Sequence, residues 1–373
     1  MTRFDAARPG GPLLAVEVDG DGAHPAAWRH AGRPPGEVLT PRALRQVVAA
    51  AEDAGFALVT FDDSPLPPGT GPGPAGRVEA GTRAAYVSRL TDRIGLVPTL
   101  HVTTTEPFHL ATQLASLDHA SGGRAGWLVG AASGAQAQAT VGTPVRSPGE
   151  LHREITDVID AARALWDSWE DDAVIKDIAT GRFLDADRVH PVDFVGASFT
   201  VKGPLITPRP PQGQIVVLVP DGLGADDRAD VVLVGRPDPA SVAVRAADAR
   251  EAGAPLVLAE VEVVLDADGV PARDRLAALE EDAPWGTTGR LRHIGSTDGL
   301  VDLVRALAGP VDGVRLHPAV LATDLPLLAA HVVPALAAAG LHRPPVPGAT
   351  LRDTLGLPRP ANRFAATAAR TLR

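Results

Sequence analysis

The sequence predicts an α/β fold, a (β/α)8 barrel formed by a single domain over residues 1–373, with an insertion after the fourth strand. Three observations support this prediction. Eight short apolar segments recur along the chain, helical patterns separate most of them, and 373 residues is long enough for one such barrel. A doubly wound open sheet, which is built from the same alternation, is the main structural alternative.

The eight predicted strands are apolar over nearly their whole length. This is typical of strands buried on both faces of a parallel sheet, and not of alternating strands with one face in water. Turn residues such as Gly and Pro bound each segment. In chain order the strands are Pro12–Val18, Phe56–Phe61, Ile94–Leu100, Arg124–Val129, Ile215–Val219, Asp230–Val234, Leu256–Leu265 and Gly313–His317.

The helices are predicted from their boundary residues and apolar stripes. Thr40 before Pro41 is an N-cap followed by a proline at the first helical position, and Gly55 ends that helix. A second helix starts near Pro107, and Ser-Gly-Gly ends it before the fourth strand. The segment Ser147–Glu150 is a capping box that begins a third helix. Further helices are predicted at Ala240–Ala252, Asp298–Leu307 and Leu325–Ala339.

The distance between the fourth and fifth strands is too long for one helix. Residues 171–214 contain polar turns and a proline-rich segment, so we interpret them as an insertion lying over one end of the barrel. The segment Leu66–Gly76, rich in Gly and Pro, is predicted to be a flexible loop after the second strand.

Composition limits the classes of function. The formal net charge is −10 and Lys and Arg form no cluster along the chain, which argues against nucleic-acid binding and against anionic membranes. No run of about 18 apolar residues predicts a transmembrane helix, and residues 1–16 have no apolar core of signal-peptide type. The chain has no cysteine, and its eleven His show no metal-ligand spacing, so no metal site is predicted. We expect a cytoplasmic protein.

Several segments, in order along the chain, resemble one family. "TEPFHLATQLASLDHASGGRAGW" (residues 105–127), "TDRIGLVPT" (91–99), "KGPLITPRPPQG" (202–213) and "TLRDTLGLPRPANRFA" (350–365) closely resemble flavin-dependent monooxygenases of the nitrilotriacetate and dibenzothiophene-sulfone type. These enzymes are a branch of the bacterial luciferase-like superfamily. The resemblance covers most of the chain, and only residues 221–292 align poorly.

The resemblance implies a luciferase-like TIM barrel, a homodimer or larger homo-oligomer, and a small organic substrate. It also implies reduced FMN, delivered by a separate flavin reductase, and O2 as co-substrate. Two alternatives stay open. In the first alternative the chain is a degenerate relative that has lost ordinary FMN binding and acts as a non-catalytic partner. In the second it is an enzyme that uses a deazaflavin in place of FMN.

The resemblance places two residues of this chain beside the flavin. Asp63, after the second strand, corresponds to an Asp near the flavin ring, and Thr103, after the third strand, to a Thr beside it. Both also have purely structural interpretations, Asp63 as a turn or cap residue and Thr103 as an N-cap of the helix at Pro107.

Three other flavin-contacting positions differ from the family pattern. Leu128 replaces an Asn that holds the flavin, and Pro148 replaces a His, while His152 stands at the position of a Tyr and is a candidate phosphate ligand. The phosphate-binding turn after the fifth strand corresponds to the turn at Gly222. Here Asp221, Asp226 and Asp227 are expected to repel a phosphate, and the helix that normally follows is nearly deleted.

The resemblance also implies substrate-side residues: His24 and Trp28 match the family's loop after the first strand, which faces the substrate, and His101, after the third strand, is a candidate for lining the open end of the barrel. A packing Trp and structural His residues explain the same positions equally well. No residue is assigned a catalytic role, because no nucleophile motif stands out and the chemistry of such enzymes belongs to the cofactor.

Overall fold

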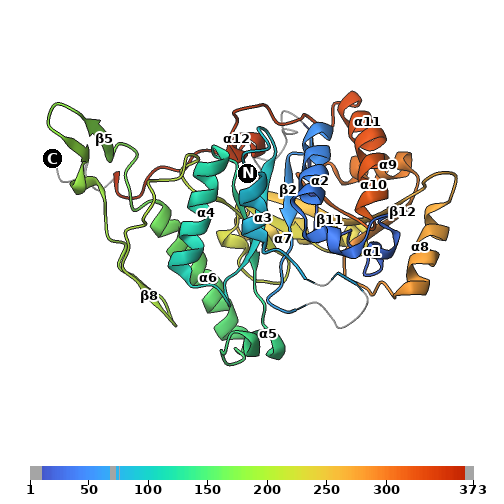
Figure 1. The fold of residues 1–373 in the computed structure, drawn as a ribbon, viewed down its shortest axis with the longest axis horizontal. Coiled ribbons are helices and arrows are strands. Elements are labelled where there is room, and N and C mark those ends of the chain that lie inside the picture. The colour runs from blue at the N-terminus through green and yellow to red at the C-terminus, as the bar shows by residue number, and fades with distance from the viewer. Residues whose placement is uncertain (1–10, 68–72, 75, 366–373) are drawn as a thin grey trace.

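The strands form a closed parallel barrel. The computed structural model describes residues 11–67, 73, 74 and 76–365, and all nine strands of its main sheet are parallel. The barrel closes because β1 pairs with β13 and β10 pairs with β11, which excludes the open-sheet alternative (Figure 1). The barrel strands are β1 (Leu13–Glu17), β2 (Leu58–Phe61), β3 (Gly95–His101), β4 (Gly126–Gly130), β9 (Val216–Pro220), β10 (Val231–Val234), β11 (Leu256–Leu265) and β13 (Gly313–Pro318).

The eight strands predicted from the sequence are these eight, so the predicted fold class is confirmed. The remaining strand of the sheet, β12 (Leu291–Gly295), was not predicted. It pairs only with the second half of β11, beyond the barrel, and its residues are mostly half-exposed. An edge strand with one face exposed to solvent has no continuous apolar run, so the pattern that predicts the other strands is missing from its sequence.

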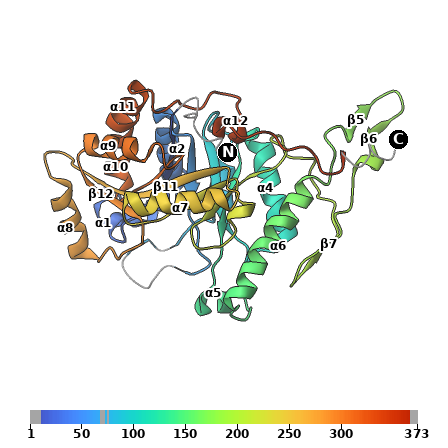
Figure 2. The same ribbon diagram turned by 180° about the vertical axis from the view of Figure 1, so that it is seen from behind.

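Helices follow most strands and cover the outside of the barrel (Figures 1 and 2). The crossover from β9 to β10 is the exception, since it holds only the 3-10 turn η3 (Asp226–Arg228), as expected from the shortened sequence there. The helices are α1 (Ala27–His30), α2 (Pro41–Ala54), α3 (Ala80–Val87), α4 (Pro107–Ser121), α5 (Ala135–Thr140), α6 (Pro148–Trp166), α7 (Pro239–Glu251), α8 (Ala272–Asp282), α9 (Thr297–Leu307), α10 (Leu321–Leu327), α11 (Val333–Ala338) and α12 (Leu351–Leu355).

The helix boundaries follow the capping chemistry of the sequence. The Thr40 hydroxyl accepts the Ala43 N–H at 3.4 Å at the start of α2, and Gly55 ends the helix at φ 93°. The capping box of α6 forms between Ser147 and Glu150 in both directions. At α4 the N-cap is Glu106, whose carboxylate accepts two backbone N–H groups, so neither Thr103 nor Thr105 has that role.

The predicted helix Leu325–Ala339 begins earlier, at Leu321, and contains a π-helical turn over Leu328–Val332. Pro334 follows this turn; it has no N–H to donate and its ring crowds the carbonyl four residues before it, which a wider turn accommodates. The segment Leu321–Ala338 is long and apolar enough to cross a membrane. It packs against α2, α9 and β11, and Asp324 within it is buried and paired with Arg275, so it is a helix of the barrel wall.

Residues 171–214 form two small hairpins, β5–β6 (Val174–Asp177, Arg182–Leu184) and β7–β8 (Phe194–Val195, Thr200–Val201). In the single chain they lie outward of the flank made by α4 and α6 (Figures 1 and 2). Arg209 fixes the returning chain, because its side chain is buried and lies 2.8 Å from Asp167 and 2.9 Å from Asp171.

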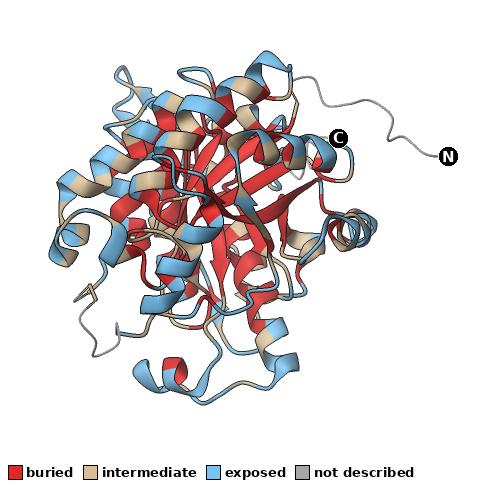
Figure 3. Cartoon of the chain, turned by 90° about the vertical axis from the view of Figure 1, so that its right-hand side faces the viewer, coloured by how far each residue is buried: buried red, intermediate tan, exposed pale blue. Residues whose placement is uncertain are grey.

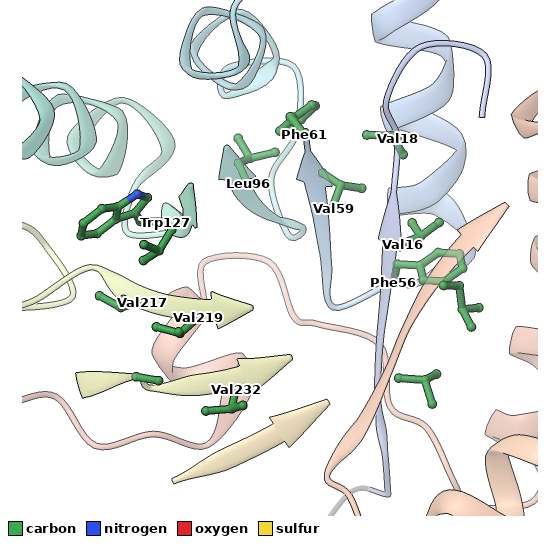
Figure 4. Packing of buried hydrophobic residues seen from close by; sticks show 14 of the residues in the cluster. Val16, Val18, Phe56, Val59, Phe61, Leu96, Trp127, Val217, Val219 and Val232 are labelled. Carbon is green, nitrogen blue, oxygen red and sulfur yellow. The ribbon is translucent and has the colours of Figure 1, made fainter. Parts of the chain in front are cut away.

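The core has two layers, one outside the barrel and one inside it. Figure 3 shows the buried residues gathered along the strands, while the outer faces of the helices are exposed. Outward-facing side chains such as Val59, Trp127 and Val219 pack under the helices (Figure 4). The interior cluster includes Leu351 and Leu355 of α12, which close the amino-terminal end of the barrel. The opposite end, at the carboxyl ends of the strands, stays open.

Candidate active site

The open end of the barrel contains a cavity of about 580 Å³, within the range of cofactor and substrate sites. It lies where barrel enzymes place their active sites, at the carboxyl ends of the strands. Loops from both halves of the barrel line it. The residues that line it include Glu17, Asp19, Asp21, His24, Trp28, Asp62, Pro74, Arg77, Thr99, His101, Leu128, Gly130, Leu223, Glu260, Arg290 and Arg315.

Arg315, on β13, holds two carboxylates together at the floor of this cavity. Its Nη1 donates to Glu260 at 2.7 Å, its Nη2 donates to Glu17, and its Nε donates to the Thr60 hydroxyl at 2.9 Å. Only 4% of the Arg315 side chain is exposed. His317 adds to the cluster, with ring nitrogens 3.1 Å from Glu17 and 3.1 Å from Glu260. These charges compensate one another inside the barrel.

The cluster changes the pKa of both carboxyl groups. Burial raises the pKa of a carboxyl group because it disfavours the charged form. At Glu17 this effect is outweighed by the nearby charges of His317 and Arg315, which lower the pKa to about 2. At Glu260 burial is likewise outweighed by the hydrogen bond from His317 and the charges of Arg315 and Arg290, so its pKa lies well below the usual range. Both groups stay ionised at neutral pH.

Asp62, just past β2, has a different environment. Burial, followed by the negative charges of Glu17 and Asp19, raises the pKa of Asp62 to about 6. Asp19 itself is paired with Arg83 at 2.5 Å. In the described part of the chain, the Asp62 carboxylate has neither an ion-pair nor a hydrogen-bond partner. Asp62 is thus a carboxylate on the cavity wall without a direct cationic partner; the more distant charges of Arg315 and Arg77 offset only part of the rise in its pKa.

The last residue of β4, Gly130, lies against a side chain of β3. His101 and Gly130 are register partners on β3 and β4. A Cβ on Gly130 would lie 2.5 Å from His101 Nδ1, so the imidazole leaves room for glycine alone. His101 Nε2 contacts the Asp63 carbonyl oxygen at 3.1 Å. The polar group of this wall therefore comes from β3 and not from β4.

The same wall has polar atoms that lack partners. Within the described residues, the hydroxyl of Thr99 and Nδ1 of His101 are buried without a hydrogen bond. Thr99 is 4% exposed and is the register partner of Leu128, which is 3% exposed and also lines the cavity. Buried polar atoms in native proteins are nearly always paired. This wall therefore fits a ligand that combines an apolar face with hydrogen-bonding edges, as a flavin ring does.

Four of the residues predicted from the sequence lie together on the cavity: His24, Trp28, His101 and Leu128. His24 is 2% exposed, its Nδ1 accepts the Ala26 N–H at 3.1 Å, and its ring lies edge-on to Trp285 at 5.0 Å. Burial lowers the pKa of His24, so the ring is neutral at pH 7.

Asp63 and Thr103 are near the cavity but their side chains are engaged elsewhere. The Asp63 carboxylate accepts the backbone N–H groups of Ser64 and Ala80, both at 2.7 Å, which joins the loop after β2 to the start of α3. The Thr103 hydroxyl donates to the Ala132 carbonyl at 2.9 Å. The Asp63 contacts match its structural interpretation as a turn or cap residue. Thr103 is not the N-cap of α4, which is Glu106, and its hydroxyl instead links the loops after β3 and β4.

His152 and Gly222 lie on a second site, at the turn after β9. Gly222 and Gly224 adopt left-handed conformations, with φ 85° and 72°. His152 Nδ1, from the first turns of α6, lies 3.3 Å from the position that a Cβ on Gly224 would occupy. Helix α6 and this turn therefore lie against each other, and both were predicted from the sequence as candidate phosphate contacts.

The acidic residues of the turn are neutralised by arginines that the sequence argument overlooked. Arg245, on α7, donates to Asp221 at 2.9 Å and to Asp226 at 2.6 Å, and Arg236 also contacts Asp221. Asp227 is paired with Arg228. The repulsion of a phosphate expected from this turn is therefore largely offset, which corrects that part of the sequence argument.

The charged residues of the cavity were not predicted from the sequence. They are Glu17, Asp19, Asp21, Asp62, Arg77, Glu260, Arg290 and Arg315, together with the buried His317, which contacts Glu17 and Glu260. A signal was present for several of them. Glu17, Glu260 and Arg315 are charged residues inside otherwise apolar strand segments, and such residues mark inward positions near the open end of a barrel. In the described ranges, no three His, Asp or Glu side chains are grouped as metal ligands.

Comparisons with known proteins agree with this geometry. The luciferase-like monooxygenase family model matches residues 22–300. One of the subunits of pristinamycin IIA synthase from Streptomyces pristinaespiralis is 34% identical, over 90% of this chain and 95% of the relative. N-acetyl-S-(2-succino)cysteine monooxygenase of Bacillus subtilis (strain 168) is 27% identical, over 94% of this chain and 98% of the relative. The crystal structure of a long-chain alkane monooxygenase has the same fold, with a TM-score of 0.82 at 19% identity over 96% of this chain and 99% of that one. The resemblance predicted from the sequence is confirmed, and the chain belongs to the luciferase-like monooxygenase family.

Proposed function

We propose that the protein oxygenates a small organic substrate with O2 and reduced FMN, which a separate flavin reductase supplies. The observation that carries this proposal is the cavity at the open end of a barrel that belongs to the luciferase-like monooxygenases. The relatives named above that cover nearly the whole chain bear the names of a monooxygenase and of a component of pristinamycin IIA synthase. No observation favours the non-catalytic alternative.

The residues of this chain divide the work of binding. Thr99, His101 and Leu128 form the wall for the flavin ring, with Gly130 allowing His101 to lie flat against β4. The glycine turn after β9 and His152 are the candidate phosphate contacts, because left-handed glycines such as Gly222 and Gly224 can present backbone N–H groups to an anion. The N–H groups of Asp221 and Leu223 are already bonded, to Leu233 and Pro220. When bound, the reduced flavin supplies the reactivity towards O2, and the protein orients the substrate and excludes water.

The charged cluster at the floor of the cavity contributes to the reaction by staying in a fixed arrangement. Glu17, Glu260, Arg315 and His317 are held by mutual contacts, so none of them needs to reorganise when a ligand enters. A preorganised polar floor beneath an apolar wall suits a reaction that has to proceed without competing water.

FMN titration tests the proposal. We expect saturable binding of reduced or oxidised FMN with Kd in the micromolar range, about −8 kcal/mol, followed by calorimetry or flavin fluorescence. Gly130→Ala pushes the added Cβ against His101 and should weaken binding at least roughly tenfold, which is about 1.4 kcal/mol.

Gly134→Ala is the matched control, since a Cβ there meets nothing within 4 Å, and it should bind FMN like the wild type. Absence of saturable binding at about 1 mM FMN, near −4 kcal/mol, contradicts the FMN proposal. A deazaflavin that binds in its place would identify the alternative cofactor.

A homodimer belongs to the same proposal, formed through an apolar groove on the flank of α2 and α3. The groove has a volume of about 450 Å³ and is lined by apolar side chains that include Leu39, Val78 and Tyr86. These three side chains are exposed by 38%, 37% and 42%. Exposed apolar side chains gathered at one groove make it a candidate interface. A second copy brings the same apolar flank, so a two-fold contact buries both at once.

We expect a dimer by light scattering at about 10 μM, and a shift to monomer in Tyr86→Asp, because a buried unpaired charge costs several kcal/mol. Val244→Asp is the control, as Val244 is 64% exposed on α7, away from the groove. A monomeric wild type, or dissociation by the control variant as well, contradicts this interface.

A further inference from the structure

The distribution of charge on the cavity wall singles out Asp62. Each other carboxylate that lines the cavity has a cationic partner in the described part of the chain. Glu17 and Glu260 are paired with Arg315, Asp19 with Arg83 at 2.5 Å, and Asp21 with Arg33 at 2.6 Å. The Asp62 carboxylate alone has none, although it is partly buried and lies near two further negative charges.

The surroundings of Asp62 point to a ligand that is mostly apolar. Trp28, Pro74, Leu128 and Leu223 line the same cavity. The buried, unpartnered hydroxyl of Thr99 belongs with Leu128 to the part of the wall assigned above to the flavin ring, so Trp28, Pro74 and Leu223 remain as the apolar surface for a second molecule. The cavity therefore offers that molecule apolar surface and one unpaired negative charge.

We propose that the cavity selects an organic molecule that carries a protonated amine, with the ammonium group paired to Asp62 and the apolar part packed against Trp28. An unpaired carboxylate in a partly desolvated cavity gains most from a cation, because the attraction is stronger there than in water. The Arg29 guanidinium lies over the Trp28 ring at 4.6 Å, so Trp28 contributes apolar surface for the rest of the molecule and the cation is assigned to Asp62 alone. The assignment rests on the proposed function, since it names the class of substrate for that site.

An anionic substrate fits this wall less well. Arg290 lies 3.5 Å from Glu260 and Arg77 lies 3.6 Å from Asp19, so each already faces a carboxylate. Arg315 is occupied by two carboxylates and is nearly inaccessible. A carboxylate ligand near Asp62 would instead meet the unpaired charge of Asp62 itself. Placing like charges side by side is a common way in which a binding site rejects the wrong ligand, here an anion.

The test compares two probes that differ mainly in charge, 4-phenylbutylamine and 4-phenylbutanoate. Each is titrated by calorimetry into the full-length protein, with and without FMN. The titrations are done at pH 8, at which Asp62 is ionised and the amine is protonated. We expect the amine to bind at least roughly tenfold more tightly than the carboxylate. Asp62→Asn should remove this difference and Asp62→Ser should do so as well, which guards against an effect peculiar to one substitution.

Asp302→Asn is the matched control, because Asp302 is a surface carboxylate on α9, paired with Arg305, and it should keep the full preference. Equal affinities for the two probes in the wild type, or no binding of either probe at about 10 mM, overturn the proposal. So does an amine preference that Asp62→Asn and Asp62→Ser leave unchanged. FMN affinity is measured separately, so a protein that prefers the amine but does not bind FMN contradicts the proposed function and leaves the role of Asp62 intact.

Discussion

Replacing Arg315 with methionine is expected to destabilise the protein by about 3–5 kcal/mol, because it leaves two buried carboxylates without their shared cation. Arg315 contacts Glu17, Glu260 and the Thr60 hydroxyl at once, and its side chain is 4% exposed. Methionine fills a similar volume, so the loss of stability reflects the missing charge more than a new cavity. Urea unfolding followed by circular dichroism measures it.

Arg305→Met is the control. Arg305 pairs with Asp302 on the exposed face of α9, with side chains 53% and 73% exposed, and such pairs contribute at most about 1 kcal/mol. If the two variants lose similar stability, the buried cluster does not hold the barrel together.

The same cluster predicts how stability depends on pH. The folded-state pKa of Glu17 is lowered from 4.5 to about 2, so its contribution to stability is complete above the unfolded value and is lost as pH falls through this window. In Arg315→Met the pKa of Glu17 should rise, because one of the three charges that lower it, those of His317, Arg315 and Arg290, is gone. Unfolding curves between about pH 5 and pH 2 should therefore show the variant losing stability at a higher pH than the wild type.

The second large effect is expected at Gly313, the first residue of β13. A Cβ there would lie 2.2 Å from the carbonyl oxygen of Leu13 and 2.6 Å from its nitrogen. Both atoms belong to the backbone of the neighbouring strand β1, which cannot move without opening the barrel. Gly313→Ala should therefore cost about 3 kcal/mol or more, at the upper end of what overpacking causes.

A thermal melt compares this variant with Gly149→Ala. Gly149 lies in the first turn of α6, has a helical backbone and meets nothing within 4 Å, so alanine there should stabilise by about 0.4–1 kcal/mol. Opposite signs for the two alanines are the expected result. A neutral Gly313→Ala would show that the β1–β13 contact is looser than the structure indicates.

The barrel was predictable because its strands are buried on both faces, which leaves continuous apolar runs of the right length. The helices were predictable where they carried caps or stripes, as at Thr40 and Ser147. Five helices were not predicted, α1, α3, α5, α8 and α12, and two of them show why. Helix α3 is short and contains Gly81, while α8 is highly charged and buries only Ala272 and Leu279.

The site was harder to predict, because contacts between distant segments decide what each residue does. Asp63 and Asp62 are adjacent, yet one carboxylate caps a backbone turn and the other faces the cavity. Arg245 neutralises a turn that lies some twenty residues earlier in the chain. Local patterns therefore identify the elements, while pairing of charges across the barrel mouth is a property of the folded chain.

The closure of the barrel also has a consequence for synthesis. Strand β1 finds its partner β13 only after residue 313, and α12 seals the amino-terminal end with Leu351 and Leu355. Until that point the growing chain carries an unfinished ring, with free strand edges at β1 and at the most recent strand. Such edges invite pairing with other chains, and contacts this distant in sequence form slowly. The last sixth of the polypeptide thus determines when the nascent chain is safe from aggregation.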